Sequence, residues 1–116
     1  MKITSLEQIE KTRMTMEGAK DVWKQVPVSA ADGTPSLSVR AFTIMPGGHT
    51  PYHTHPFEHL NYVIEGEGAL VTAEGEERPV KKGDFALVLP GEKHQYRNKS
   101  AEHPMIMICA VPKEYE

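Results

Sequence analysis

Apolar and polar residues alternate along this chain in short runs, and turn residues separate the runs at regular intervals. The turn signals include Asp32-Gly33, Pro46-Gly47-Gly48, Gly83-Asp84 and Pro90-Gly91. Short apolar runs at this spacing are typical of an all-β sandwich or barrel rather than of alternating helices and strands. The expected strands cover residues 22–28, 37–45, 60–65, 69–73, 85–89, 94–98 and 104–111.

Only residues 5–11 have a helical pattern, in which Ser5 can cap a turn and Leu6 and Ile9 lie three positions apart. We expect one short helical turn there. The chain has no internal repeat, low-complexity tract or linker, so residues 1–116 are predicted to form a single domain.

The strand that follows the histidine-rich segment has two contrasting faces. Alternation places His59, Asn61 and Val63 on one face and Leu60, Tyr62 and Ile64 on the other. If the histidine face points into a barrel, the apolar face needs cover from another strand layer or from a second subunit. The pattern therefore favours a homodimer.

Composition excludes several classes of protein. No apolar run approaches the roughly 18 to 20 residues of a membrane helix, and the N-terminus lacks the apolar core of a secretory signal. Thirteen Lys and Arg residues stand against sixteen Asp and Glu residues, without a basic stripe, so neither nucleic acid nor a membrane is an expected partner. The lone cysteine cannot form an internal disulfide, which agrees with a cytoplasmic location.

The segment HTPYHTHPFEHL, residues 49–60, holds four of the six histidines. In an extended chain His53 and His55 project from one face, with their bases about 6.5 to 7 Å apart, so two ring nitrogens can meet at one ion. His59 follows Pro56, and His94 enters a later strand directly after a Pro-Gly turn. These four histidines are the predicted ligands of one divalent transition metal. His49 and His103 lack such support and are predicted to be exposed or to lie outside the ligand set.

Two motifs in this order resemble those of the cupins, G-x5-H-x-H-x3,4-E-x6-G and G-x5-P-x-G-x2-H-x3-N. The matching residues are Gly47, His53, His55, His59 and Gly66 in the first motif, and Gly83, Gly91, His94 and Asn98 in the second. The motifs cover residues 47–66 and 83–98. The resemblance implies a double-stranded β-helix, or jelly roll, with one metal ion inside the barrel.

The sequence departs from the cupin pattern at two positions. Leu89 occupies the proline position, and Pro90 follows it, which preserves a turn. His59 stands where the family has glutamate; Glu58 is adjacent and could compete, but strand alternation points it away from the face of His59. Four imidazoles suit Mn, Fe, Co, Ni, Cu or Zn better than Mg or Ca, and we expect Mn or Fe.

Three further residues are candidates for a substrate pocket. Arg40 lies in mid-strand, where it could hold a substrate carboxylate or form a salt bridge at the barrel edge. Cys109 shares a strand face with Met105 and Met107, and either this face or that of Ile106, Ile108 and Ala110 lines the barrel. Tyr96 lies two residues after His94 on the same face and could contact the ligands or the substrate.

Fold does not determine reaction, since cupins include dioxygenases, isomerases, decarboxylases and binding modules. The absence of an obvious general base favours chemistry performed by the metal. We therefore expect a dioxygenase-like oxidoreductase acting on a small organic substrate at a four-histidine centre. A non-catalytic module that binds or senses a sugar or anion is the alternative, followed by a metal with a purely stabilising role.

Overall fold

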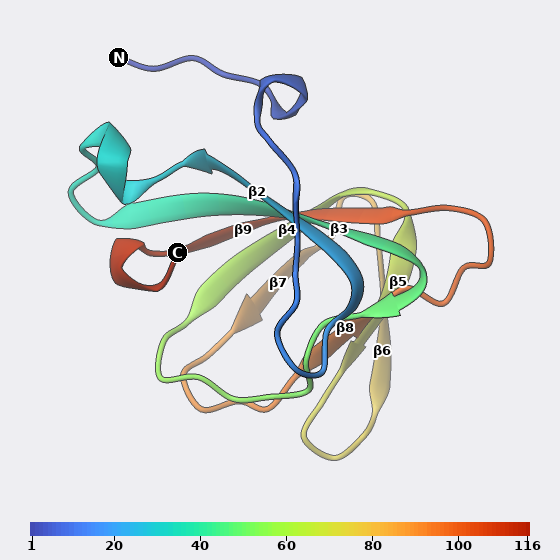
Figure 1. Cartoon of the computed structure of the whole chain (residues 1–116). Coiled ribbons are helices and arrows are strands. Elements are labelled where there is room, and N and C mark those ends of the chain that lie inside the picture. Colours follow the sequence, from blue (N-terminus) through green and yellow to red (C-terminus); the bar gives the residue numbers. More distant parts are fainter.

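Nine strands form one hydrogen-bonded sheet in the computed structural model, which describes residues 1–116 (Figure 1). The all-β prediction is confirmed. The strands are β1 (Thr12–Arg13), β2 (Lys20–Val28), β3 (Leu37–His49), β4 (His59–Glu65), β5 (Glu67–Val71), β6 (Glu77–Lys81), β7 (Phe85–Val88), β8 (Gln95–Arg97) and β9 (Met105–Pro112).

The strand order is that of a rolled jelly-roll sheet, β6-β5-β8-β3-β9-β4-β7, with β2 also pairing with β3 and β1 with β2. Apart from the β5–β6 hairpin, neighbours in this order are not consecutive along the chain, and every pairing is antiparallel. The long strand β3 pairs with β2, β9 and β8, and so joins the two ends of the sheet. In Figure 1, β5, β6 and β8 gather at one end of the molecule, and the N-terminal segment crosses in front of the sheet.

Some predicted elements differ from those observed. Strand β6 is missing from the expected strands, because the charged stretch that contains its sequence ERPVK was interpreted only as a solvated hairpin face; four of the five residues are indeed exposed. The strand expected over 94–98 is confined to Gln95–Arg97, and His94 instead forms an isolated bridge with His53. The strand expected over 69–73 begins earlier, at Glu67, and ends at Val71.

Helical structure is limited to three 3-10 turns of three residues each, η1 (Leu6–Gln8), η2 (Ala30–Asp32) and η3 (Lys113–Tyr115). The predicted N-terminal turn is thus present as η1, whereas η2 and η3 were not predicted. None of these helices has the length and hydropathy needed to span a membrane.

The neighbouring strands β4 and β9 both turn one face toward the barrel interior. His59, Asn61 and Val63 are buried, as the alternation predicted. On β9 the sulfur-bearing face of Met105, Met107 and Cys109 points inward, which settles the alternative that the sequence left open. The core cluster comprises Val22, Phe42, Ile44, Val63, Val80, Tyr96, Met105, Met107, Cys109 and Val111. Histidines and apolar residues therefore share one interior.

The opposite face of β4 is apolar and open to solvent. Leu60 pairs with Leu87 of β7, and Tyr62 pairs with Phe85, whose ring centroid lies 4.4 Å from that of Tyr62. Leu87 is 58% exposed and Phe85 70% exposed. We call these four residues the outer β4–β7 face. Within this chain, no other layer covers it.

Candidate metal centre

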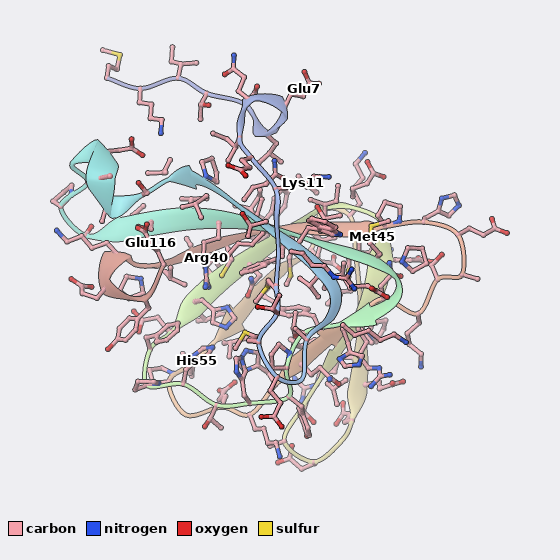
Figure 2. All side chains as sticks on the ribbon, in the orientation of Figure 1. Glu7, Lys11, Arg40, Met45, His55 and Glu116 are labelled. Atoms are coloured by element: carbon pink, nitrogen blue, oxygen red, sulfur yellow. The ribbon has the colours of Figure 1, made fainter.

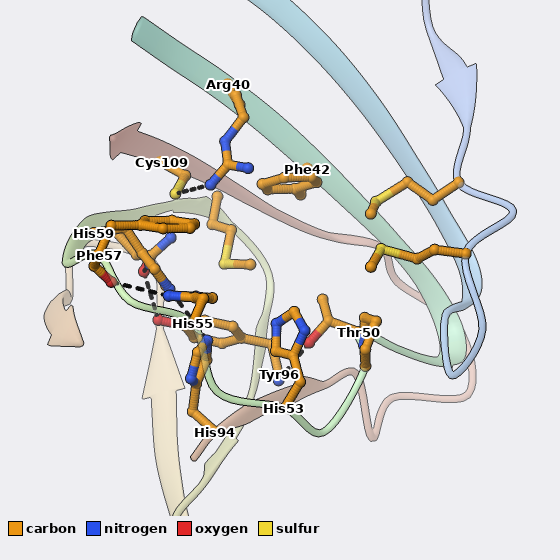
Figure 3. Close-up of a pocket in the computed structure, with 15 residues that line it drawn as sticks. Arg40, Phe42, Thr50, His53, His55, Phe57, His59, His94, Tyr96 and Cys109 are labelled. Atoms are coloured by element: carbon orange, nitrogen blue, oxygen red, sulfur yellow. Dashed lines mark hydrogen bonds between the residues drawn. The ribbon is translucent and has the colours of Figure 1, made fainter. Parts of the chain in front are cut away.

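His53, His55 and His94 converge at the mouth of the barrel, although His94 is far from the other two in sequence (Figure 3). The backbones of His53 and His94 hydrogen-bond to each other in both directions, at 3.2 and 3.1 Å. This bridge brings the second motif against the first. One ring nitrogen from each of the three histidines lies within 4.8 Å of the others, so the cluster could hold a metal ion.

His59 lies beside this cluster at the start of β4 and is only 5% exposed. Its Nε2 atom is 3.1 Å from Nε2 of His94, and its ring centroid is 4.8 Å from that of His55. The neighbouring Glu58 is exposed, as the alternation predicted. The structure therefore brings all four predicted histidines together and leaves Glu58 outside.

Hydrogen bonds at Nδ1 fix the orientation of three of the rings. Nδ1 of His55 lies 2.9 Å from the carbonyl oxygen of Phe57, and Nδ1 of His94 lies 2.9 Å from that of Glu92. Nδ1 of His59 lies 2.6 Å from Oδ1 of Asn61. Because these oxygens only accept, each Nδ1 carries the proton and each Nε2 presents a lone pair, the arrangement that metal-binding histidines use.

Burial also favours the neutral form of His53, His59 and His94. It lowers the pKa of His59 to about 3, an effect that hydrogen bonding to Asn61 only partly opposes. Burial likewise lowers the pKa of His94 and of His53, and neighbouring histidines add to the effect. Neutral imidazole is the form that binds a metal.

The distance between the Nε2 atoms of His59 and His94 fits a shared cation. Two lone pairs facing each other at 3.1 Å repel unless a positive centre lies near both. Metal–nitrogen bonds of about 2.1 Å separate two ligand nitrogens by about 3.0 Å at right angles and about 3.4 Å at the tetrahedral angle. The observed distance between His59 and His94 lies within this range.

A cavity of about 270 Å³ opens beside the histidines, and all three predicted pocket residues, Arg40, Tyr96 and Cys109, line it. Its lining includes apolar side chains but no Asp or Glu. The complete lining is Met14, Met16, Arg40, Phe42, Thr50, Pro51, His53, His55, Phe57, His59, Asn61, His94, Tyr96, Met107 and Cys109.

Polar contacts connect the cavity wall to the histidines. The hydroxyl of Tyr96 donates to Oδ1 of Asn61 at 2.9 Å, and burial raises the pKa of Tyr96. Nη2 of Arg40 donates to Sγ of Cys109 at 3.0 Å. Burial raises the pKa of Cys109 as well, although Arg40 acts in the opposite direction. Tyr96 and Cys109 are therefore neutral parts of the wall.

Several lining residues were not predicted from the sequence. Phe57 stacks on His55 with ring centroids 4.0 Å apart. Tyr115 of η3 also stacks on Phe57, with ring centroids 4.1 Å apart. Strand alternation placed Asn61 on the face of His59, although Asn61 was not predicted as a pocket residue. No local signal marks Met14 or Met16, because only the fold brings the N-terminal segment to the cavity.

The two remaining histidines lie outside the cluster. His49 is at the end of β3, half-buried, with Nδ1 3.3 Å from Nε2 of Gln95. His103 is exposed beside Glu102. Asn98, the last residue of the second motif, is buried but donates to the carbonyl oxygens of Ile44 and His103. Its role is to hold the fold rather than to bind the ion.

Known proteins with related sequences include enzymes. The chain is 36% identical over 73 residues to gentisate 1,2 dioxygenase 1 from Aquipseudomonas alcaligenes, covering 63% of this chain and 21% of that protein. It is 30% identical over 105 residues to L-ectoine synthase from Halomonas elongata, covering 89% of this chain and 76% of that protein. The chain thus spans only about a quarter of the length of the two gentisate dioxygenases that it matches, 21% and 27%.

Solved structures and a family profile agree on the fold. The polyketide cyclase RemF from Streptomyces resistomycificus superposes with a TM-score of 0.91 at 25% identity, covering 97% of this chain and 80% of that one. A cupin-2 domain from Rhodospirillum rubrum superposes with a TM-score of 0.81 at 20% identity, covering 96% and 74%. The Cupin_2 family, described as the cupin domain, matches residues 40–111. The chain therefore belongs to the cupin family.

Proposed function

We propose that this cupin is a metal-dependent oxidoreductase that uses dioxygen to oxidise a small organic substrate. The observation that supports this most strongly is the donor set, neutral imidazole nitrogens beside a cavity without an acidic residue. His53, His55, His59 and His94 would hold one Mn or Fe ion. Such an ion supplies Lewis acidity and one-electron chemistry, which the side chains of the cavity lack.

The chain's own residues would bind and orient the substrate. Phe42, Phe57 and Met107 give the cavity an apolar wall that excludes water, and the Tyr96–Asn61 hydrogen bond holds the ring of His59 in place. The cavity is smaller than the roughly 300 to 1,000 Å³ of drug-sized sites, which favours a compact substrate. Similarity to the gentisate dioxygenases supports an aromatic acid as the first substrate to test.

An oxygen electrode tests this proposal. Protein loaded with Mn(II) or Fe(II) is expected to consume dioxygen in the presence of at least one member of a panel of phenols and organic acids that includes gentisate. His94→Ala, loaded in the same way, is the matched control and is expected to consume dioxygen no faster than the free metal ion does. Tight ligand binding without turnover would instead support the binding-module alternative.

Similarity to RemF supports ring closure as a second candidate function. That protein is a polyketide cyclase, and its structure matches almost the whole of this chain. A metal at the four histidines could polarise a carbonyl group, and the apolar cavity could fold a flexible substrate for cyclisation. Product formation from a poly-β-ketone under nitrogen, measured by mass spectrometry, would favour this function over oxidation.

The outer β4–β7 face supports a homodimer. Its four apolar side chains lie side by side on paired strands, and monomeric proteins rarely expose contiguous apolar patches of large area. A twofold axis through this face would place each side chain against its counterpart.

Replacing Leu87 with glutamate is expected to weaken self-association about tenfold or more, because two carboxylates would be buried close to the twofold axis. Met45→Glu is the matched control, since Met45, labelled in Figure 2, is also exposed but lies on β3, which β9 separates from β4. Sedimentation equilibrium measures the change. A monomeric wild-type protein, or equal association of both variants, would contradict the proposed interface.

A further inference from the structure

Arg40 is a cation in the cavity without an anionic partner. It lies on β3 and is half-buried, its guanidinium carbon 4.9 Å from the centre of the Phe42 ring (Figure 3). Its one hydrogen bond goes to the thiol of Cys109, and its Nε atom is buried without a partner. All five ion pairs of the structure involve other residues. A charge in such surroundings is costly unless an anion compensates it.

Asn61 provides a second donor that lacks a strong acceptor. This residue is 2% exposed, and its Oδ1 faces the hydroxyl of Tyr96 and Nδ1 of His59. In this orientation the NH2 group, Nδ2, is the end of the amide that faces neither residue. Nδ2 is buried in the cavity wall, and the one acceptor beside it is the thiol of Cys109, which is weak. A buried amide donor that has only a thiol to donate to indicates that a stronger acceptor is missing.

The strand register brings the two donors to one place. Cys109 on β9 is directly opposite Arg40 on β3 and directly opposite Asn61 on β4. The three side chains therefore form a row across adjacent strands, which are spaced about 4.8 Å apart. His59 precedes Asn61 by two residues on the same face, so this row borders the histidine cluster. In Figure 2, Arg40 and His55 lie on the same side of the molecule, away from Met45.

The lining contains no carboxylate that could satisfy these donors internally. Outside the lining, Lys24 is close enough to Arg40 to add positive charge there, and Glu116 acts on Lys24. Glu116 accepts hydrogen bonds from Ser38 and from the backbone of Ala30, and so is already engaged. A bound ligand can supply the anionic acceptor that the cavity itself lacks.

We propose that Arg40 and Asn61 form a carboxylate subsite, so that the ligand of this cavity is a small organic acid. The guanidinium group gives a carboxylate a planar pair of N–H donors, and the Asn61 amide gives a third. The rest of the acid extends toward the histidine cluster. This inference rests on the proposed function only in taking the cavity as the active site, and it holds for oxidation and for other chemistry of an acid.

Calorimetry with a matched pair of probes tests the subsite. The acid is 2-hydroxybenzoate, and its neutral isostere is 2-hydroxybenzamide; both are titrated under nitrogen into the protein as purified. Wild-type protein is expected to bind the acid about 10- to 100-fold more tightly, which is the range for a hydrogen bond to a charged group. Equal binding of the two probes, or no binding of the acid, overturns the proposal.

Variants then assign the preference to Arg40. Arg40→Met is expected to abolish the preference for the acid. Arg40→Lys is expected to retain part of it, because lysine keeps the positive charge but lacks the planar pair of N–H donors. Arg78→Met removes an exposed arginine of β6 and is expected to keep the full preference. Metal content and melting temperature are measured for each variant to show that the metal site and the fold persist. A preference for the acid that survives in Arg40→Met overturns the assignment.

The outcomes separate this inference from the proposed function. Selective binding of the acid without oxygen consumption for any substrate rejects the oxidoreductase and keeps the subsite. Oxygen consumption together with equal binding of acid and amide rejects the subsite and keeps the oxidoreductase.

Discussion

Replacing His53 with alanine is expected to lower the metal affinity of this cupin by at least about 100-fold. Loss of a hydrogen-bond partner of a ligand alone typically costs 10- to 100-fold, and loss of a ligand should cost more. The backbone bridge between His53 and His94 does not depend on the imidazole, so the fold should persist. Metal content after dialysis, measured by elemental analysis, and direct titration with Mn(II) check this expectation.

Two matched variants sharpen the result. His103→Ala removes an exposed histidine outside the cluster and is expected to leave metal content unchanged. His59→Glu is expected to retain the metal, since carboxylate also binds Mn and Fe, but to reduce its Lewis acidity by adding a negative charge. Full metal content in His53→Ala would contradict the assignment of the four histidines as ligands.

The histidine cluster could be predicted because its information is local. The i, i+2 spacing of His53 and His55 and the alternation that follows His59 fix which face each ring occupies. The same alternation correctly placed Glu58 outside and Asn61 inside. His94 is far from the others in sequence; its position directly after a Pro-Gly turn at the start of a strand made it a candidate fourth ligand, and the two-motif resemblance supported that choice.

The other features depend on strand pairing, which the local sequence does not determine. Arg40 was predicted as a pocket residue with an open alternative, a salt bridge at the barrel edge. Register with Cys109 and Asn61 places it in the cavity, and no ion pair includes it. Strand β6 was missed for a related reason, because pairing with β5 holds a charged segment in an extended form that its own sequence does not favour.

Gly66 shows how a motif residue can be essential for the fold rather than for the metal. It links β4 to β5 with φ of +76°, a conformation that other residues rarely adopt. A Cβ atom there would lie 2.3 Å from the carbonyl oxygen of Pro104 and 3.0 Å from Cα of Met105. Both contacts are backbone atoms at the start of β9, which cannot move without shifting the strand that carries Cys109 and Met107.

Gly66→Ala is therefore expected to lower the free energy of unfolding by about 2 to 4 kcal/mol, the sum of backbone strain and a steric clash. Gly75→Ala is the matched control, because Gly75 has φ of +82° but no atom within 4 Å of its Cβ position. The control should cost only about 1 to 2 kcal/mol of backbone strain. Urea unfolding of both variants isolates the clash as the difference between them. Equal destabilisation would mean that β9 yields easily at Pro104, and that the close approach of the two backbones does not fix the position of the cavity wall.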